Sequence, residues 1–188
     1  MTLMKSRKAV LAAALLVGLA AMPVQAAMVA QMNLGEITHN AATIARVTVL
    51  DVEQTSISLG GGELPVTVYT LAVDDPIKGE FDTSKGGAVI ALRMLGTIKQ
   101  QPPTSGIQKV SVLPDLPRLQ LGHDYLLFAT APSTIGLSAP VGLGQGTFGI
   151  YTEGKVEMAA NELGNAGLFS GPVTYDELVA AVNAELGQ

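Results

Sequence analysis

Cysteine is missing from the 188-residue sequence, and histidine occurs only twice, as His39 and His123. Without cysteine the chain has no disulfide and no thiol nucleophile, so its stability must come from a hydrophobic core. Basic residues are also few, since 11 Lys and Arg stand against 16 Asp and Glu. Binding to a nucleic-acid backbone needs a basic patch, so this composition argues against a nucleic-acid partner.

The N-terminus carries a short basic stretch made of Lys5, Arg7 and Lys8. An apolar run, AVLAAALLVGLAAM, follows it and is broken by Pro23. This run is too short to span a bilayer comfortably as a helix, and the small residues of VQA, ending at Ala26, suit a cleavage site. We therefore expect a Sec-type signal peptide over 1–26. Cleavage after Ala27 is a near alternative, and an uncleaved membrane anchor is the competing interpretation.

Cleavage after Ala26 would leave 162 residues with eight basic and 16 acidic side chains. The mature chain would carry a formal charge of about −8, with the acids scattered as on a solvated surface. No later segment approaches the roughly 20 continuous apolar residues of a transmembrane helix. We expect a periplasmic or secreted protein with no membrane span after cleavage, long enough for one domain around one core.

Four segments have the apolar, β-branched composition of strands. They are 43–53, 66–73, 88–95 and 125–130. Within the first, the apolar alternation changes phase between Val49 and Leu50, which predicts a β-bulge. Glycines 60–62 predict a hairpin turn. We expect the second strand to end at 74–76, because proline cannot donate to a ladder.

The C-terminal part predicts a hairpin and then one helix. TFGIY and KVEMA lie on either side of Glu153 and Gly154 and form the hairpin pattern. Thr174 and Glu177 give a capping-box pattern for a helix over 175–186. Its apolar side is formed by Leu178, Val179, Val182 and Leu186. Irregular loops are expected at 97–118, with IQKVSV as a candidate short strand, and at 131–140.

These elements predict a single, mostly β domain over 43–188. The fold class is one antiparallel β-barrel, OB-like, or a β-sandwich, with about six to eight strands and one C-terminal α-helix. Residues 27–42 carry no clear pattern, so we expect them to form a loosely ordered lead-in.

The stretch VGLGQGTFGIY contains G-x-G-x-x-G at Gly144, Gly146 and Gly149. A dinucleotide site needs these glycines between a strand and a helix, whose N-terminus faces the phosphates, but a strand-like run follows Gly149. A kinase loop needs a later lysine and two later aspartates in set contexts, which the 39 residues after Gly149 do not hold. We interpret the glycines as a tight bend with close backbone approach and expect no cofactor.

His123, in the turn GHDY, is the candidate general base. Asp124 or Asp115 would orient its ring, and a hydrolase-type enzyme would rest on one of these pairs. No G-x-S-x-G motif or other recognisable serine nucleophile accompanies them. We therefore expect His123 to be a surface turn residue and assign no catalytic residue. His39, near the expected mature N-terminus, is a weaker candidate.

Four carboxylates lie within nine residues, at Asp74, Asp75, Glu80 and Asp82. Oxygen ligands of this kind suit Ca²⁺, but the alternating order of a calcium loop is missing. An acid-rich solvated turn is the favoured interpretation, so we expect no metal site.

Most of the aromatic side chains lie in the expected strands. They include Tyr69, Tyr125, Phe128, Phe148 and Tyr151. Packing is the usual role of an aromatic residue in a strand, and a binding platform stays open for any that face outward.

The order IARVTVLDVE, VYTLAVDDPIKG, LPRLQLGHDYLLFA and VGLGQGTFGIY resembles a group of bacterial exported proteins of uncharacterised role. The matching positions are Ile44, Val47, Tyr69, Thr70, Lys78, Gly79, Leu119, Gly122, Tyr125, Phe128, Gly142, Gln145, Gly146 and Phe148. A more distant likeness is to the netrin-like fold of metalloproteinase inhibitors, an OB-type barrel with a similar KG turn. Those inhibitors use an N-terminal cysteine, which this chain lacks, so the likeness implies the barrel and not the inhibition.

Neither resemblance supplies a catalytic residue. A compact β-scaffold with long loops at 97–118 and 131–140 favours a non-catalytic binding or interaction module of the cell envelope. Its partner would be a protein or another envelope component. The alternative is a periplasmic hydrolase-type enzyme that uses His123 with Asp124 or Asp115.

Overall fold

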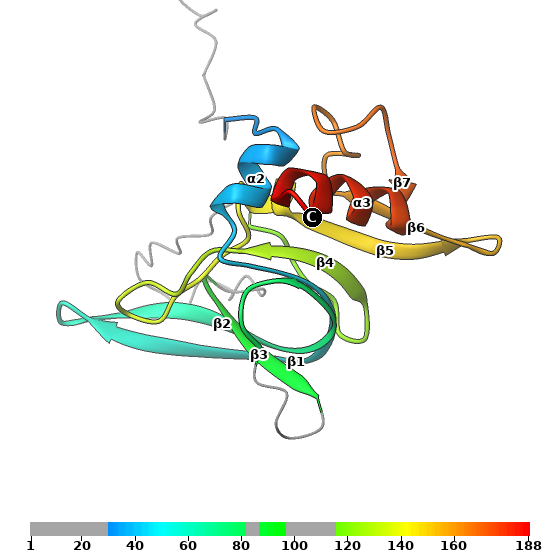
Figure 1. The fold of residues 1–188 in the computed structure, drawn as a ribbon. Helices are drawn as coiled ribbons and strands as arrows, with labels where there is room; N and C mark the ends of the chain where they lie inside the picture. The colour runs from blue at the N-terminus through cyan, green and yellow to red at the C-terminus, as the bar shows by residue number, and fades with distance from the viewer. Residues whose placement is uncertain (1–29, 82–86, 97–115) are drawn as a thin grey trace, which may run out of the picture. The chain divides into compact units, whose positions relative to one another are not determined.

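The computed structural model describes residues 30–81, 87–96 and 116–188, and Gln31–Gln188 form one compact unit. Within these residues, seven antiparallel strands make one sheet in the order β3-β2-β1-β4-β5-β6-β7 (Figure 1). The strands are β1 (Thr43–Leu59), β2 (Gly62–Lys78), β3 (Ala88–Leu95), β4 (Asp124–Ala129), β5 (Thr147–Glu153), β6 (Val156–Asn161) and β7 (Val173–Thr174). Over the described residues the sheet is not closed, so the fold is an open barrel or sandwich. The predicted mostly β fold with a C-terminal helix is confirmed.

β1 and β2 form a long hairpin that turns at Gly60 and Gly61. Both glycines have positive φ, 60° and 82°, a conformation that favours glycine and suits a two-residue hairpin turn. The pairing shifts register between Val49 and Asp51, so the predicted bulge is confirmed. Leu50 is the extra residue, and its side chain is 51% exposed.

β2 continues through Pro76 to Lys78, so the predicted end of this strand at 74–76 is wrong. Pro76 pairs with Ala45 between two shifts in register, and the pairing of β2 with β3 reaches only as far as Val73. A proline is tolerated in a strand at such an irregular position, where a missing N–H donor breaks no regular ladder.

A helix, α2 (Leu34–Asn40), lies inside the stretch 27–42, so the predicted loosely ordered lead-in is wrong for these residues. Asn33 and Glu36 form a capping box, because each side chain accepts a hydrogen bond of 2.8 Å from the other's backbone N–H. The helix also buries Ile37 completely. Its seven residues are too few to show a helical apolar period in the sequence.

The C-terminal helix α3 (Tyr175–Leu186) has the predicted bounds and the predicted capping box of Thr174 and Glu177. Its side chains Leu178 and Val182 are fully buried. Among the described residues, neither α2 nor α3 is long and apolar enough to cross a membrane. The candidate strand IQKVSV and most of the loop 97–118 lie outside the described residues.

The core has two parts, one on each face of β4. One part lies between the helices and β4–β6 and includes Ile37, Phe128, Phe148, Leu178 and Val182. The other is enclosed by the curve of β1–β4 and includes Val47, Tyr69, Leu71, Leu92 and Leu127. Figure 1 shows α2 and α3 together on one face of the β4–β6 region. Alternate residues of β5 and β6 therefore face away from the helices, and this second face carries the site described below.

Candidate functional site

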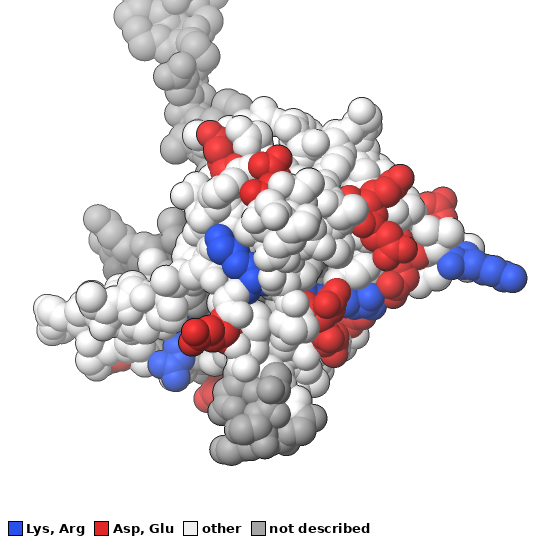
Figure 2. Space-filling model, viewed as in Figure 1, with Lys and Arg blue, Asp and Glu red and all other residues white. Residues whose placement is uncertain are grey.

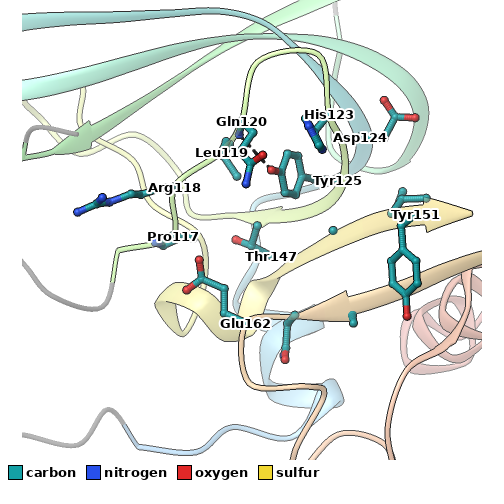
Figure 3. A pocket seen from close by; sticks show the side chains of 14 residues that line it. Pro117, Arg118, Leu119, Gln120, His123, Asp124, Tyr125, Thr147, Tyr151 and Glu162 are labelled. Carbon is teal, nitrogen blue, oxygen red and sulfur yellow. Dashed lines mark hydrogen bonds between the residues drawn. The ribbon is translucent and has the colours of Figure 1, made fainter. Parts of the chain in front are cut away.

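The structure shows no hydrogen bond between His123 and Asp124, one of the two pairs that the sequence offers. Both carboxylate oxygens of Asp124 have other partners: Oδ2 accepts from Arg46 and Oδ1 accepts from Thr48, each at 2.8 Å. His123 is exposed, and its ring points in a different direction from the Asp124 carboxylate (Figure 3). The other proposed partner, Asp115, lies outside the described residues. A base oriented by Asp124 is therefore not present in this arrangement.

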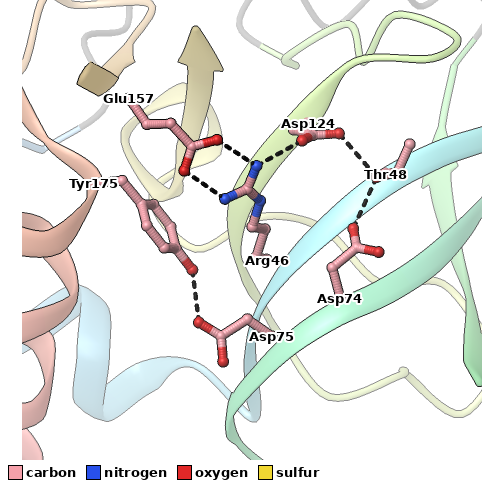
Figure 4. Close-up of polar contacts among 7 residues, drawn as sticks. All are labelled: Arg46, Thr48, Asp74, Asp75, Asp124, Glu157 and Tyr175. Carbon is pink, nitrogen blue, oxygen red and sulfur yellow. Dashed lines mark hydrogen bonds and ion pairs between the residues drawn. The ribbon is translucent and has the colours of Figure 1, made fainter. Parts of the chain in front are cut away.

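Asp124 instead belongs to a polar network centred on Arg46 of β1 (Figure 4). The guanidinium donates through Nη1 and Nη2 to both carboxylate oxygens of Glu157 on β6, each at 2.8 Å. Its Cζ also lies 5.0 Å from the ring centroid of Tyr175, the first residue of α3. The hydroxyl of Tyr175 donates to Asp75 of β2 at 2.9 Å. One network thus joins β1, β2, β4, β6 and α3.

The pKa values in this network follow from its hydrogen bonds. Burial opposes the charge of Asp124, but the bonds from Arg46 and Thr48 outweigh it and hold the pKa of this carboxyl below its usual range. The hydrogen bond from Arg46 also lowers the pKa of Glu157. Burial, and then the bond to Asp75, raises the pKa of Tyr175, so its hydroxyl stays a donor. Each charged group of the network already has a partner, so its role is to hold the strands and α3 in place.

Asp74 and Asp75 of the predicted acidic turn lie within β2, and both take part in the polar contacts around Arg46. Asp74 accepts a hydrogen bond from Thr48 at 2.7 Å, and Asp75 accepts from Tyr175. Asp82 lies outside the described residues. Over the part of the chain that the structure describes, no three His, Asp or Glu side chains are grouped to hold a metal ion.

His39 has a local role at the end of α2. Its Nδ1 lies 2.7 Å from the carbonyl oxygen of Gly35, four residues earlier, and donates to it when that nitrogen carries the proton. This contact joins the side chain to the first turn of the same helix.

A hollow of about 310 Å³ lies on the face of β4–β6 that is turned away from the helices (Figure 3). Its floor is made of small residues. Gly149 of β5 pairs directly with Ala160 of β6, and on its other side with Tyr125 of β4. Directly paired residues share a face of the sheet, so the missing side chain of Gly149 leaves open space beside the Tyr125 ring. We call this space the Gly149 hollow.

Two aromatic rings and an acid border the Gly149 hollow. Tyr125 is held at its hydroxyl, which accepts a hydrogen bond from the backbone N–H of Gln120 at 3.0 Å. Tyr151, two residues beyond Gly149, lies on the same face of β5 and is 43% exposed. Burial raises the pKa of Tyr125, and the nearby charge of Glu162 raises it further. Glu162 therefore acts electrostatically on the space beside Tyr125.

The floor of the hollow also contains a polar atom that lacks a partner. Thr147, on the same face of β5 as Gly149, is 4% exposed. Its hydroxyl has no hydrogen-bond partner among the described residues. Leaving a buried hydroxyl without a partner costs about 1–3 kcal/mol, so such groups call for an explanation. The oxygen of this hydroxyl is covered by neighbouring protein atoms, as is the unpartnered hydroxyl oxygen of Thr38.

The three glycines of the G-x-G-x-x-G pattern have separate structural roles. Gly144 and Gly146 lie in the short 3-10 helix η1 (Leu143–Gly146), and Gly149 lies inside β5, so no α-helix follows the motif. A Cβ atom at Gly146 would collide with the backbone carbonyl oxygen of Val141. The predicted close backbone approach is confirmed at Gly146.

The sequence placed Tyr125 and Tyr151 in strands but did not reveal the hollow between them. A usable signal was present. The hairpin of β5 and β6 turns at Gly154, and counting back along both strands from this turn sets Gly149 opposite Ala160. Two small residues facing each other beside tyrosines leave an unfilled space on a sheet. Finding it required the pairing of β4 with β5, which separate segments of the sequence do not show.

Comparison of the chain with protein-family models, with curated proteins and with solved structures gave no match. The resemblances that rest on the sequence patterns stay predictions.

Proposed function

We propose that this chain is an exported, non-catalytic binding module of the cell envelope that holds a small ligand in the Gly149 hollow. The observation that carries the proposal is the hollow itself, about 310 Å³ in volume, with Gly149 in its floor and Tyr125, Tyr151 and Glu162 around it. Ligand pockets have volumes of roughly 300–1,000 Å³ and a few placed polar groups among aromatic side chains. The hollow is at the small end of that range, which favours a small molecule over a large one.

The same geometry gives less support to the hydrolase alternative. A general base needs a fixed ring within reach of the proton it takes, usually held by a carboxylate. The carboxylate of Asp124 is occupied by Arg46 and Thr48, and His123 is exposed in its turn. A binding function needs only the shape and the polar groups of the hollow, and these are present.

Export is the second part of the proposal and rests on the sequence of residues 1–26. Mass spectrometry of the protein recovered from a periplasmic or culture fraction tests it. We expect an N-terminus at Ala27 or Met28. An intact chain that begins at Met1 and stays in the membrane fraction would show an uncleaved anchor instead.

Ligand-observed NMR with a library of small polar compounds tests the binding function. We expect some compounds to bind the wild-type chain and to lose binding in Gly149→Val, because the added side chain fills the hollow. Ala91→Val, at an exposed position of β3, is the matched control and should leave binding unchanged. If no compound distinguishes the wild type from Gly149→Val, the hollow is not a binding site.

A further inference from the structure

The two tyrosines and the acid around the Gly149 hollow favour one class of ligand. We propose that the hollow binds a small organic cation, an amine or a quaternary ammonium group. This inference rests on the proposed binding function and adds the chemistry of the ligand.

The aromatic pair is the first argument. Tyr125 lies directly opposite Gly149, and Tyr151 lies two residues further along β5, so the two tyrosines are diagonal neighbours on one face. Diagonal neighbours in a sheet are about 7–8 Å apart, and Gly149 puts no side chain between them. A cation within roughly 6 Å of the centroid of an aromatic ring is attracted to its face, and both tyrosines line the hollow.

The charges around the hollow are the second argument. Glu162 borders the hollow and is near enough to act on the Tyr125 hydroxyl. Arg118 also lines the hollow, but Figure 3 shows its guanidinium pointing away from it. The local field therefore favours a positive ligand. The excess of acidic side chains over the whole chain, also visible on the face drawn in Figure 2, would raise the concentration of cations near the surface.

Thr147 lines the same hollow. It lies on the same face of β5 as Gly149, two residues before it, at the end of the hollow near Glu162. Its hydroxyl oxygen is covered by protein atoms, so the rings and Glu162, and not this hydroxyl, determine the ligand class. An anion would instead face Glu162, and an uncharged sugar would gain nothing from the charge of Glu162.

Choline and its uncharged isostere 3,3-dimethylbutan-1-ol separate charge from shape, because the two differ in one atom and its charge. Titrations of both, and of glucose and acetate, are followed by ligand-observed NMR and calorimetry. We expect choline to bind in preference to the other three probes, and its affinity to fall as ionic strength rises. We expect Glu162→Gln to weaken choline binding by roughly two- to five-fold. Glu153→Gln, an exposed acid at the far end of β5, is the matched control and should have no such effect.

The results distinguish the ligand class from the binding function. Equal or tighter binding of the isostere, of glucose or of acetate overturns the cation class, as does failure of choline to bind while library compounds do. If every compound binds the wild type and Gly149→Val equally well, or binds neither, the binding function itself is overturned. Ala160→Val fills the same hollow from β6 and replaces Gly149→Val if that variant does not fold, as judged by circular dichroism. Specific choline binding that both filling variants abolish supports the proposal.

Discussion

Asp74 and Asp124 both accept a hydrogen bond from one atom, the hydroxyl oxygen of Thr48. The distances are 2.7 Å to Asp74 Oδ2 and 2.8 Å to Asp124 Oδ1. A hydroxyl has one hydrogen, so it can donate to only one of the two carboxylates at a time. Arg46 offsets the repulsion on the Asp124 side, through an ion pair of 2.8 Å. The stability of the junction of β1, β2 and β4 therefore depends on the charges of Asp124 and Arg46. The first two predictions test these two residues.

The first prediction concerns acid. Asp124 has a folded-state pKa below its usual value of about 3.9, so its ionised form stabilises the fold above that value. The stabilisation is lost as the pH falls through the lower, folded-state pKa. We expect Asp124→Asn to unfold at a lower temperature than the wild type at pH 7. The difference should shrink as the pH falls towards 3.

Thermal melts at pH 7, 5, 4 and 3 measure this effect. Asp51→Asn is the control, since Asp51 is an exposed aspartate of β1 that takes no part in the network. A difference in melting temperature between Asp124→Asn and the wild type that stays constant over this pH range would contradict the stabilising role of the ionised Asp124.

The second prediction concerns Arg46. Its side chain is 20% exposed and serves both Asp124 and Glu157. Replacing it by methionine keeps much of the packing but leaves two carboxylates without their donor. We expect Arg46→Met to lower the free energy of unfolding by about 2 kcal/mol. Arg46→Lys should lose less, because lysine keeps the charge but cannot bind Glu157 through two nitrogens.

Urea unfolding of the three proteins gives these differences directly. Arg93→Met is the matched control, because Arg93 is an exposed arginine of β3 that takes no part in the network. If Arg46→Met lowers the free energy of unfolding by no more than Arg93→Met does, the network does not stabilise the fold.

The third prediction concerns calcium. Asp74 and Asp75 already accept hydrogen bonds from Thr48 and Tyr175, so a calcium ion would have to replace these bonds. We expect the melting temperature to be the same in millimolar calcium and in a chelator. An increase of several degrees with calcium, abolished in the double variant Asp75→Asn with Asp82→Asn, would show a metal site formed by these carboxylates.

Local patterns in the sequence predicted local elements well. The bounds of β3 and α3 agree with the predictions, because β3 has its own apolar composition and α3 has its own capping box. The β1–β2 hairpin is longer than predicted. Its outer part, 54–59, is mostly polar and mostly exposed, so pairing with β2 and not burial makes it a strand.

Contacts between distant segments could not be predicted in the same way. Arg46 and Glu157 are 111 residues apart in sequence, and they meet because β1 pairs with β4 while β5 and β6 follow β4 in the sheet. The order of strands in a sheet is set by packing over the whole domain. Neither RVTVLDVE, which holds Arg46, nor KVEMA, which holds Glu157, carries a local pattern that predicts this order, and the Arg46 network was therefore missed.

The last prediction returns to the glycine motif. An alanine Cβ at Gly146 would collide with the carbonyl oxygen of Val141, a backbone atom that cannot move without displacing the turn before η1. We expect Gly146→Ala to lower the free energy of unfolding by about 1–3 kcal/mol. At Gly149 the nearest atoms to an added Cβ are 3.7 Å away or more, which is ordinary contact. Gly149→Ala should therefore change stability by less than about 0.5 kcal/mol.

Gly144 is the third member and the internal control. An added Cβ there would lie 3.2 Å from the carboxylate of Glu162, the movable end of an exposed side chain, so Gly144→Ala should cost less than Gly146→Ala. Urea unfolding of the three variants ranks them. If the three glycines served to bring the backbone close to a phosphate, all three substitutions would weaken nucleotide binding. The free energies of unfolding of the three variants would then follow no expected order. A Gly146→Ala protein as stable as the wild type would show that backbone packing against Val141 is not what requires glycine at this position.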